Sequence, residues 1–314
     1  KDRSLFIPIE VENAFSLAER ILFGISCVLH LPALFCLLRV TPPHQAQIKT
    51  FLVVCQITVI VSDVYISIFL QYVFVPEAYA GYCKGIICHF IPPPSSVGLF
   101  IFTIGALTIA TLACIVARHQ AMMPITSTLK MGKNTKRGLL VAVLLTFTIP
   151  TTVYVVSPFN AAESDRLINE SNYDLDWMRK RGYCAMMPDT LFVHAISWTA
   201  IACFIGTLII AITLFFHMFY VLSHETKTSS NTKVLIRKSL RRLFVQLNVP
   251  ILFIAIPLII LFLQFETRWF PIRSGMVAMF MTSFHPIVHN LVILLVVPTY
   301  RKAIVDFIRK CRLP

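Results

Sequence analysis

Seven long apolar stretches, separated by shorter charged segments, constrain this chain more than any other feature of its sequence. A helix needs about 20 mostly apolar residues to cross the hydrocarbon core of a membrane. With 57% hydrophobic and only 14% charged residues, the chain cannot cover the surface of a soluble domain. We therefore expect an all-α membrane protein, a single domain at 1–314 built as a seven-transmembrane helix bundle. A tail at 298–314 follows predicted spans at 21–38, 50–75, 92–117, 138–160, 190–223, 243–265 and 274–297.

The segments between the predicted spans alternate in charge. The segments 39–49, 118–137, 224–242 and the tail hold 18 Lys and Arg against two acidic residues, whereas the other set holds 10 against 12. Because Lys and Arg collect on the cytoplasmic side, we expect the N-terminus outside and the C-terminus in the cytoplasm. The net charge of +13 is then a topology signal. Membrane lipid is the expected partner of these basic residues, and no nucleic-acid partner is expected.

Two features of the predicted outside segments agree with this orientation. Asn169 begins an Asn-x-Ser sequon in the longest of them, so we predict that it is a glycosylation site. Cys83, Cys88 and Cys184 fall in or beside outside segments, where oxidising conditions permit a disulfide. We predict that Cys184 pairs with Cys88, which lies closer to the start of the third span, and keep Cys83 as the alternative partner.

Several motifs occur in order along the chain: LLRVTPP at 37–43, PEAYAGY at 76–82, QLNVPIL at 246–252, SFH at 283–285 and PTYRK at 298–302. Together they resemble the nematode serpentine chemoreceptors, in particular class H and its relatives. The resemblance implies a chemosensory G-protein-coupled receptor, not an enzyme, in the plasma membrane of a sensory cilium. Its implied partners are a small-molecule or peptide ligand and a heterotrimeric G protein, with no cofactor.

Asp63 is the one Asp, Glu, Lys or Arg within the predicted spans, and a charge at that depth is costly enough to suggest a function. At a rise of about 1.5 Å per residue, Asp63 in span two and His285 in span seven lie at similar depths, roughly 20 Å from the inner ends of their spans. We predict that Asp63 forms a polar switch with His285 or Asn290. The alternative is a protonated Asp63 that caps a backbone carbonyl or a neighbouring serine.

Two other classes of protein stay open at this point. His285 and His289 are four residues apart and share a helix face, so with His30 or His194 they could bind zinc in an intramembrane hydrolase. The predicted orientation opposes this alternative, and we expect no metal. A small-solute transporter is the third candidate, but the odd number of spans and the single intramembrane charge argue against it. Span seven holds no lysine, which excludes a retinal Schiff base.

An external ligand would enter between the outer thirds of spans three, five, six and seven. The predicted ligand-binding residues are His194, Trp198, Phe100, Phe262, Met276 and Phe280. On the opposite face a G protein would dock against Arg118, at the end of span three, and a basic stripe before span six. That stripe is formed by Lys238, Arg241 and Arg242. The motif around Arg118 lacks the acidic residue that precedes the arginine in many rhodopsin-like receptors, so an ionic latch there stays open.

Prolines predict where the spans bend. Pro250 and Pro257 each remove one helical hydrogen bond from span six, and they lie seven residues, about two turns, apart. Their bends therefore fall on the same side of the helix, which predicts a hinge. Pro92, Pro93 and Pro94 cannot lie together in the middle of a helix, so we expect the third span to begin there.

Overall fold

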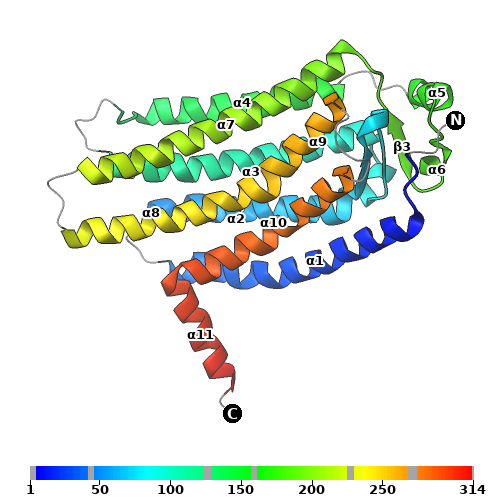
Figure 1. Ribbon diagram of the computed structural model, residues 1–314. Coiled ribbons are helices and arrows are strands. Elements are labelled where there is room, and N and C mark those ends of the chain that lie inside the picture. The colour runs from blue at the N-terminus through cyan, green and yellow to red at the C-terminus, as the bar shows by residue number, and fades with distance from the viewer. Residues whose placement is uncertain are drawn as a thin grey trace.

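The computed structural model of the protein describes residues 5–41, 46–123, 129–156, 161–224, 230–267 and 274–312. Long helices lie side by side in a bundle, and a small sheet and two short helices gather at one end (Figure 1). The long helices are α1 (Ile9–Phe35), α2 (Ala46–Val64), α3 (Pro93–Met122), α4 (Lys133–Val156), α7 (Leu191–His224), α8 (Ser230–Pro250), α9 (Ile256–Thr267) and α10 (Ser274–Val296). Helix α11 (Pro298–Arg312) leaves the opposite end at a steep angle.

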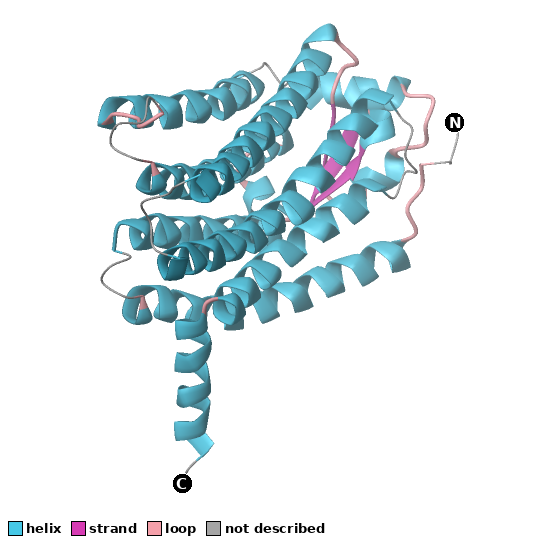
Figure 2. Ribbon diagram, turned by 60° about the vertical axis from the view of Figure 1, so that its left-hand side comes forward, coloured by secondary structure: helices cyan, strands magenta, loops and turns pink. Residues whose placement is uncertain are grey.

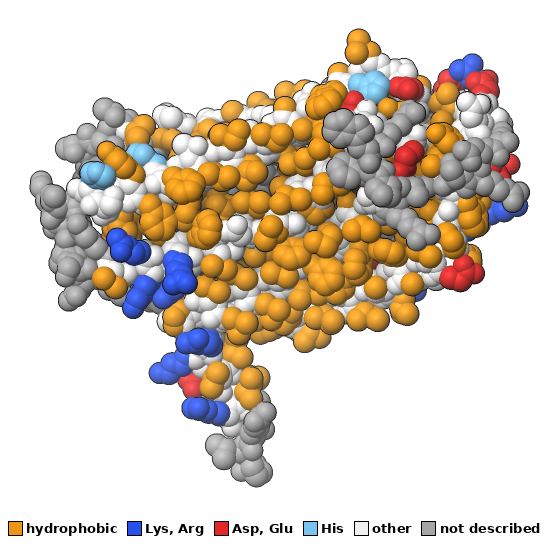
Figure 3. All heavy atoms as spheres, in the orientation of Figure 1, with side chains coloured by type: hydrophobic (Ala, Val, Ile, Leu, Met, Phe, Trp, Pro, Cys, Tyr) orange, Lys and Arg blue, Asp and Glu red, His pale blue; other side chains and the backbone are white. Residues whose placement is uncertain are grey.

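Six helical segments among the described residues are long and apolar enough to cross a membrane, with α8 and α9 forming one of them. Helix α4 lies in the place of the fourth predicted span and packs against α3 and α7. The flank of the bundle seen in Figure 3 is almost wholly hydrophobic. Over the described residues, large side chains such as Leu31 and Phe216 are 74% and 64% exposed. A surface of this kind requires lipid as its solvent, because it would be unstable in water.

The bundle is not wholly helical, which corrects the expectation of an all-α protein. Three strands form one antiparallel sheet in the order β1 (Tyr72–Val75), β2 (Ala80–Cys83) and β3 (Tyr183–Met186). Figure 2 shows them gathered away from the point where α11 leaves. The end formed by the sheet with α5 (Ala161–Glu170) and α6 (Asp176–Arg179) is called the sheet end below, and the end that α11 leaves is called the tail end.

Residues 72–75, which we predicted as the end of span two, belong to the sheet instead. Gln71 ends the preceding helix because it adopts a left-handed conformation, with φ of 40°. The turn to β2 begins at Pro76 and closes at Tyr79, which is also left-handed with φ of 50°. A Cβ atom on Gly81 would clash with the Tyr72 ring and would lie 2.7 Å from the Val73 carbonyl oxygen. The PEAYAGY motif therefore forms a tight hairpin that only glycine permits at 81.

In the described residues, three π-helical turns interrupt the long helices, at Cys36–Val40, Tyr65–Leu70 and Ile251–Ala255. The last one follows Pro250, which has no N–H group to donate, so the hydrogen bonds there shift to the wider π spacing. A cavity of about 520 Å³, open space included, is lined by this turn together with α3, α7 and the end of α8. The predicted hinge in span six is therefore built as a π-helical turn between two α-helices.

Candidate functional site

A cavity lies at the sheet end, between the β1–β2 hairpin, α3, α7 and α9. Its open space, with the mouth to the surroundings included, is about 590 Å³. Its lining is formed by Phe74, Tyr79, Val97, Phe100, Ile101, Met187, Val193, Ile196, Ser197, Leu261, Phe262 and Phe265. Aromatic and aliphatic side chains dominate this wall, so the cavity offers apolar contact above all.

Ring contacts hold the aromatic wall of this sheet-end cavity in place. Phe265 from α9 meets the ring of Phe74 edge to face, with ring centroids 6.2 Å apart, and lies 6.1 Å from the ring of Tyr79. Phe74 also packs against Tyr72 at 4.5 Å. Because these rings come from the hairpin and from a long helix, the sheet fixes one wall of the cavity against the bundle.

The charged groups near the cavity are bound by partners outside its lining. His194 lies between two carboxylates: its Nδ1 is 2.8 Å from Glu266 Oε2, and its Nε2 is 2.8 Å from Asp189 Oδ1. Gln264 donates to Glu77 Oε1 at 2.6 Å. The ring of His194 also packs edge to face against Tyr79, at 5.8 Å between centroids. His194 therefore lies at the rim of the cavity and is held there by ion pairs.

The predicted ligand-binding residues do not all line the cavity. Phe100 and Phe262 line the cavity. Trp198, on the exposed side of α7, is 50% exposed. Met276 packs in the core of the sheet end, and Phe280 packs against the rings of Phe15 and Phe284. The apolar periodicity of α7 and α10 predicted depth along the bundle but did not predict which helix face points inward.

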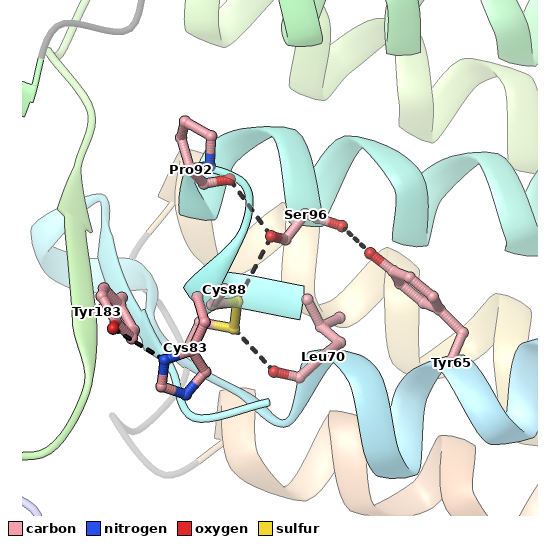
Figure 4. The surroundings of a disulfide bond; sticks show 8 residues. Tyr65, Leu70, Cys83, Cys88, Pro92, Ser96 and Tyr183 are labelled. Atoms are coloured by element: carbon pink, nitrogen blue, oxygen red, sulfur yellow. Dashed lines mark hydrogen bonds between the residues drawn. A yellow bond between two sulfur atoms is a disulfide. The ribbon is translucent and has the colours of Figure 1, made fainter. Parts of the chain in front are cut away.

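The disulfide differs from the prediction. Cys83 pairs with Cys88, and Cys184 is a free thiol (Figure 4). Sheet register explains the difference, because Cys184 lies opposite Tyr82 and its side chain therefore shares the face of Tyr82, not of Cys83. Cys83 and Cys88 instead lie together in the main hydrophobic core. Cys184 lies outside that core, and its burial raises the pKa of its thiol to about 12. The expected Cys88–Cys184 pair is thus replaced by a local bond.

This bond ties the end of β2 to the short segment before α3. Close to it, the Tyr65 hydroxyl donates to the Ser96 carbonyl oxygen at 2.8 Å, which joins α2 to the first turn of α3 (Figure 4). The Tyr183 hydroxyl is 2.9 Å from His89 Nδ1, which brings β3 to the same place. Asn169, the predicted glycosylation site, is exposed at the end of α5, where its side-chain oxygen accepts a hydrogen bond from Arg179.

Asp63 is buried in a polar cluster between α1, α2 and α10. Its Oδ2 lies 3.1 Å from His30 Nε2 and accepts a hydrogen bond from Ser26, while Oδ1 is 3.4 Å from the Ser67 hydroxyl. All three of these neighbours can donate a hydrogen bond. They suit a carboxylate group, which in its ionised form accepts hydrogen bonds and donates none. The depth argument placed Asp63 correctly inside the bundle, but His30, its main partner, was considered only as a possible metal ligand.

Further hydrogen bonds join the Asp63 cluster to α10, and the donor and the acceptor of each bond can be assigned. Gln56 Nε2 donates to Asn290 Oδ1 at 2.8 Å, and Asn290 Nδ2 lies 2.9 Å from His30 Nδ1. With Nδ1 of His30 accepting, its Nε2 carries the hydrogen that points to Asp63. Asn290 is therefore joined to Asp63 through His30. The sequence feature that could have indicated this series of hydrogen bonds is the pair Gln56 and Asp63, two polar residues that lie seven positions apart in span two.

His285 and His289 are separate from this cluster. Their rings pack against each other at 5.5 Å, and the Nε2 atom of each is buried with no hydrogen-bond partner in the described part of the chain. The zinc-hydrolase alternative needs a third ligand. Across the described residues, no group of three His, Cys, Asp or Glu side chains is arranged to hold a metal ion. His30 is engaged with Asp63, and His194 lies at the sheet end.

The tail end carries the predicted coupling residues. Arg118 is half-buried at the end of α3, within electrostatic range of Tyr300 and Arg242. Lys238 and Arg241 are exposed on α8. Lys and Arg side chains gather at this end and along α11 (Figure 3). The arrangement leaves a basic surface around one partly buried arginine.

A second directed chain of hydrogen bonds, which the sequence analysis missed, lies beside Arg118. Gln120 Nε2 donates to His119 Nδ1 at 3.1 Å, so the His119 Nε2–H group can donate to His217 Nδ1 at 2.9 Å. This bond joins α3 to α7. Gln120 also holds the start of the next segment, because its Oε1 accepts from the Met131 backbone N–H at 2.8 Å.

The turn after α1 is joined to α11 by a further bond at the tail end. The Thr41 hydroxyl lies 2.6 Å from the Tyr300 hydroxyl. Burial raises the pKa of Tyr300, so its hydroxyl stays protonated and remains available for this bond. The closing PTYRK motif therefore begins α11 at Pro298 and anchors it through Tyr300.

Comparison with known families agrees with this architecture. Residues 10–310 match the family described as serpentine type 7TM GPCR chemoreceptor Srh. A comparison with curated proteins gives no match. The match includes every long helix, both hydrogen-bond chains and the sheet-end cavity, and it confirms the resemblance drawn from the motifs. The protein is an integral membrane protein, and the chain belongs to the Srh family of serpentine seven-transmembrane GPCR chemoreceptors.

Proposed function

We propose that this chain is a chemosensory receptor that binds an external small-molecule or peptide cue in the sheet-end cavity and activates a heterotrimeric G protein at its tail end. Family membership supports the receptor role. The observation that carries the proposal is the placement of two different surfaces at opposite ends of one bundle. An apolar cavity lies at one end, and a basic surface around Arg118 lies at the other.

The sheet end faces outward in this proposal, and the tail end faces the cytoplasm. The Cys83–Cys88 disulfide supports this orientation, since disulfides persist in oxidising compartments. The exposed Asn169 sequon supports it as well. Lys and Arg at the tail end suit the cytoplasmic leaflet, where anionic lipid attracts each of them by about 1 kcal/mol. The plasma membrane of a sensory cilium is the location that this role requires.

Ligand binding falls to the cavity walls. Phe100 and Phe262 contact the ligand directly, and His194 controls the rim. Trp198, Met276 and Phe280 lie away from this cavity and act, if at all, through the packing of α7 and α10.

Signal transfer falls to the Asp63 cluster and the π-helical turn Ile251–Ala255. The cluster connects α1, α2 and α10 at one depth, so a ligand-dependent shift of α10 changes the bonds of Asn290 and His30. The cavity of about 520 Å³ beside the π-helical turn gives α8 room to move against α3. Such movement exposes Arg118 to the G protein, with Lys238, Arg241 and Arg242 around it.

Nucleotide exchange in isolated membranes tests the proposal. Membranes from cells that express the chain together with a panel of Gα subunits are exposed to mixtures of candidate cues, and binding of a non-hydrolysable GTP analogue is measured. We expect cue-dependent exchange that requires this chain. The matched control is Arg118→Ala at equal surface level, which should respond to no cue. If no Gα subunit of the panel shows cue-dependent exchange, the proposed coupling to a G protein is wrong.

A further inference from the structure

We propose that the sheet-end cavity takes an uncharged, mainly apolar molecule with a single hydrogen-bonding group, such as a ketone or an alcohol, and that Ser197 binds that group. The inference rests on the proposed function for its biological meaning, but its physical content concerns the cavity alone. Three observations carry it: the lining of the cavity, the state of the charges around it, and the unused hydroxyl of Ser197.

The lining excludes a charged ligand. None of the described residues that form it is Asp, Glu, Lys, Arg or His. Moving an ion from water into such surroundings costs far more than apolar contact returns, unless an opposite charge meets it. A neutral apolar ligand instead gains about 25 cal/mol for each Å² that it buries, and the rings of Phe100, Phe262 and Phe265 offer faces and edges for contact.

The nearest charges cannot supply that partner. His194 is bound on both ring nitrogens by Asp189 and Glu266, so neither nitrogen is free for a ligand. Glu77 is held by Gln264. A charged ligand at the rim would have to compete with these existing bonds. The selection for neutral molecules therefore rests mainly on the uncharged lining.

Ser197 differs from Thr199, the next hydroxyl residue along its helix. Thr199 donates to the Ala195 carbonyl oxygen at 2.6 Å, the usual arrangement for a hydroxyl within a helix. Ser197 is 7% exposed and lines the cavity, yet its hydroxyl makes no hydrogen bond with any described residue. Because this hydroxyl lines the cavity and is not used by the described residues, a ligand that supplies a carbonyl or hydroxyl oxygen gains a hydrogen bond at this position.

Chemical labelling of full-length receptor in membranes tests the charge selection. Ser197→Cys is treated with a neutral benzyl methanethiosulfonate and with positively and negatively charged methanethiosulfonates, and the rates are corrected for the native cysteines in the unmodified chain. Leu191→Cys, at an 86% exposed position at the start of α7, is the matched control. Relative to the control, we expect the neutral reagent to label Ser197→Cys at least tenfold faster than either charged reagent. Equal relative rates would overturn the proposal.

Protection of a second cysteine tests the role of Ser197. In Ile101→Cys, which also lines the cavity, labelling is measured with increasing benzyl alcohol or with toluene, which has the same ring but no hydroxyl. We expect benzyl alcohol to protect at about five- to tenfold lower concentration, the effect of one hydrogen bond. Adding Ser197→Ala should remove this preference. Equal protection by both compounds, or an unchanged preference with Ser197→Ala, would overturn the assignment.

The labelling measurements need no G protein, so their outcome is separate from that of the proposed function. Selective labelling without any cue-dependent nucleotide exchange would contradict coupling and leave the ligand class supported. Exchange driven only by charged cues, with rapid labelling by charged reagents, would support the receptor and reject the ligand class.

Discussion

The two ends of the bundle are held together by different chemistry. At the sheet end, a disulfide, a three-stranded sheet and a buried carboxylate with two cations connect segments far apart in the sequence. Among the described residues of the tail end, hydrogen bonds without any ion pair connect the helices, as between His119 and His217 or between Thr41 and Tyr300. Covalent and ionic links resist rearrangement, whereas one neutral hydrogen bond contributes only about 1 kcal/mol.

This difference matches two tasks. A recognition site works best when its walls are fixed before the ligand arrives, because less ordering is required on binding. A signalling surface must change shape, so the links that hold it must be weak enough to exchange. If this comparison is correct, substitutions at the sheet end should cost stability, while those at the tail end should change signalling in a folded protein.

The largest expected effect is on stability at the sheet end. Glu12 is 1% exposed and binds both Lys84 and Arg181, whose guanidinium also lies 4.6 Å over the Trp177 ring. Glu12→Ala leaves these cations without their carboxylate, so we expect a loss of about 3–5 kcal/mol. Thermal unfolding in detergent and surface delivery measure it. Glu10→Ala, at an exposed position in the same turn, is the control. An equal midpoint for both variants would break the comparison.

Arg118→Ala should have the next largest effect and should leave folding intact. We expect normal surface delivery and at least a hundredfold loss of G-protein activation, about 2.7 kcal/mol. Neutralising the exposed Arg241 and the partly exposed Arg242 together should only weaken activation, because charges in contact with solvent contribute little individually. Nucleotide exchange at matched surface levels distinguishes the two variants. Normal activation by Arg118→Ala would remove the coupling role from this face.

Asp63→Asn should alter both stability and signalling, since Asp63 lies between the two ends. The amide presents hydrogens where His30 and Ser26 now donate, so we expect a cost of about 1–3 kcal/mol and reduced cue-dependent exchange. His30→Phe should reproduce the signalling defect because it breaks the same bond. Unchanged surface expression and unchanged signalling in Asp63→Asn would show that the cluster is no switch.

His217→Phe should raise basal activity. It removes the acceptor for His119 and frees α3 from α7 at the tail end, so we expect cue-independent exchange to increase about fivefold, the equivalent of about 1 kcal/mol. His224→Phe lies on the same helix, but its ring bonds only within α7, and it should behave like the unmodified chain. Unaltered basal exchange in His217→Phe would mean that the tail end is held by other contacts.

The smallest effect concerns the free thiol at the sheet end. Burial raises the pKa of Cys184 to about 12, so its thiol stays protonated at neutral pH, and alkylation should begin only as the pH approaches that value. In denaturant the same thiol should react near pH 8.5. Peptide mass spectrometry follows the reaction and should also find Cys83 linked to Cys88. Fast alkylation of native protein at pH 7.5 would mean that this end opens readily.

The helices were predictable because each apolar stretch must satisfy its own backbone groups within a membrane. The sheet was not, because β1 and β2 depend on β3, which follows about one hundred residues later in the chain. Residues 72–75 are as apolar as the helix before them, so composition carried no signal for the change. Only the PEAYAGY motif marked the hairpin, and its conformation depends on close contact between Gly81 and Tyr72.

The sequence predicted how far along the bundle axis the candidate-site residues lie. It did not predict which way their side chains point around each helix. Helices α7 and α10 are apolar on nearly all sides, so Trp198 and Phe280 could be placed along the bundle axis but not around it. Asp63 was matched in depth with His285, yet its bonds run instead through His30 of α1 to Asn290. The disulfide depended on sheet register, which no count along the sequence contains.

The π-helical turn at Ile251–Ala255 has a geometric consequence for the whole length of α8 and α9. Compared with an α-helix, a π turn holds one extra residue, and one residue corresponds to a rotation of about 100° and a rise of about 1.5 Å. Phe262 at the cavity and Arg242 at the tail end are therefore offset by this amount from a continuous α-helix. Conversion of that one turn to α-helical spacing would rotate one end of the helix relative to the other, so a single residue sets their relative orientation.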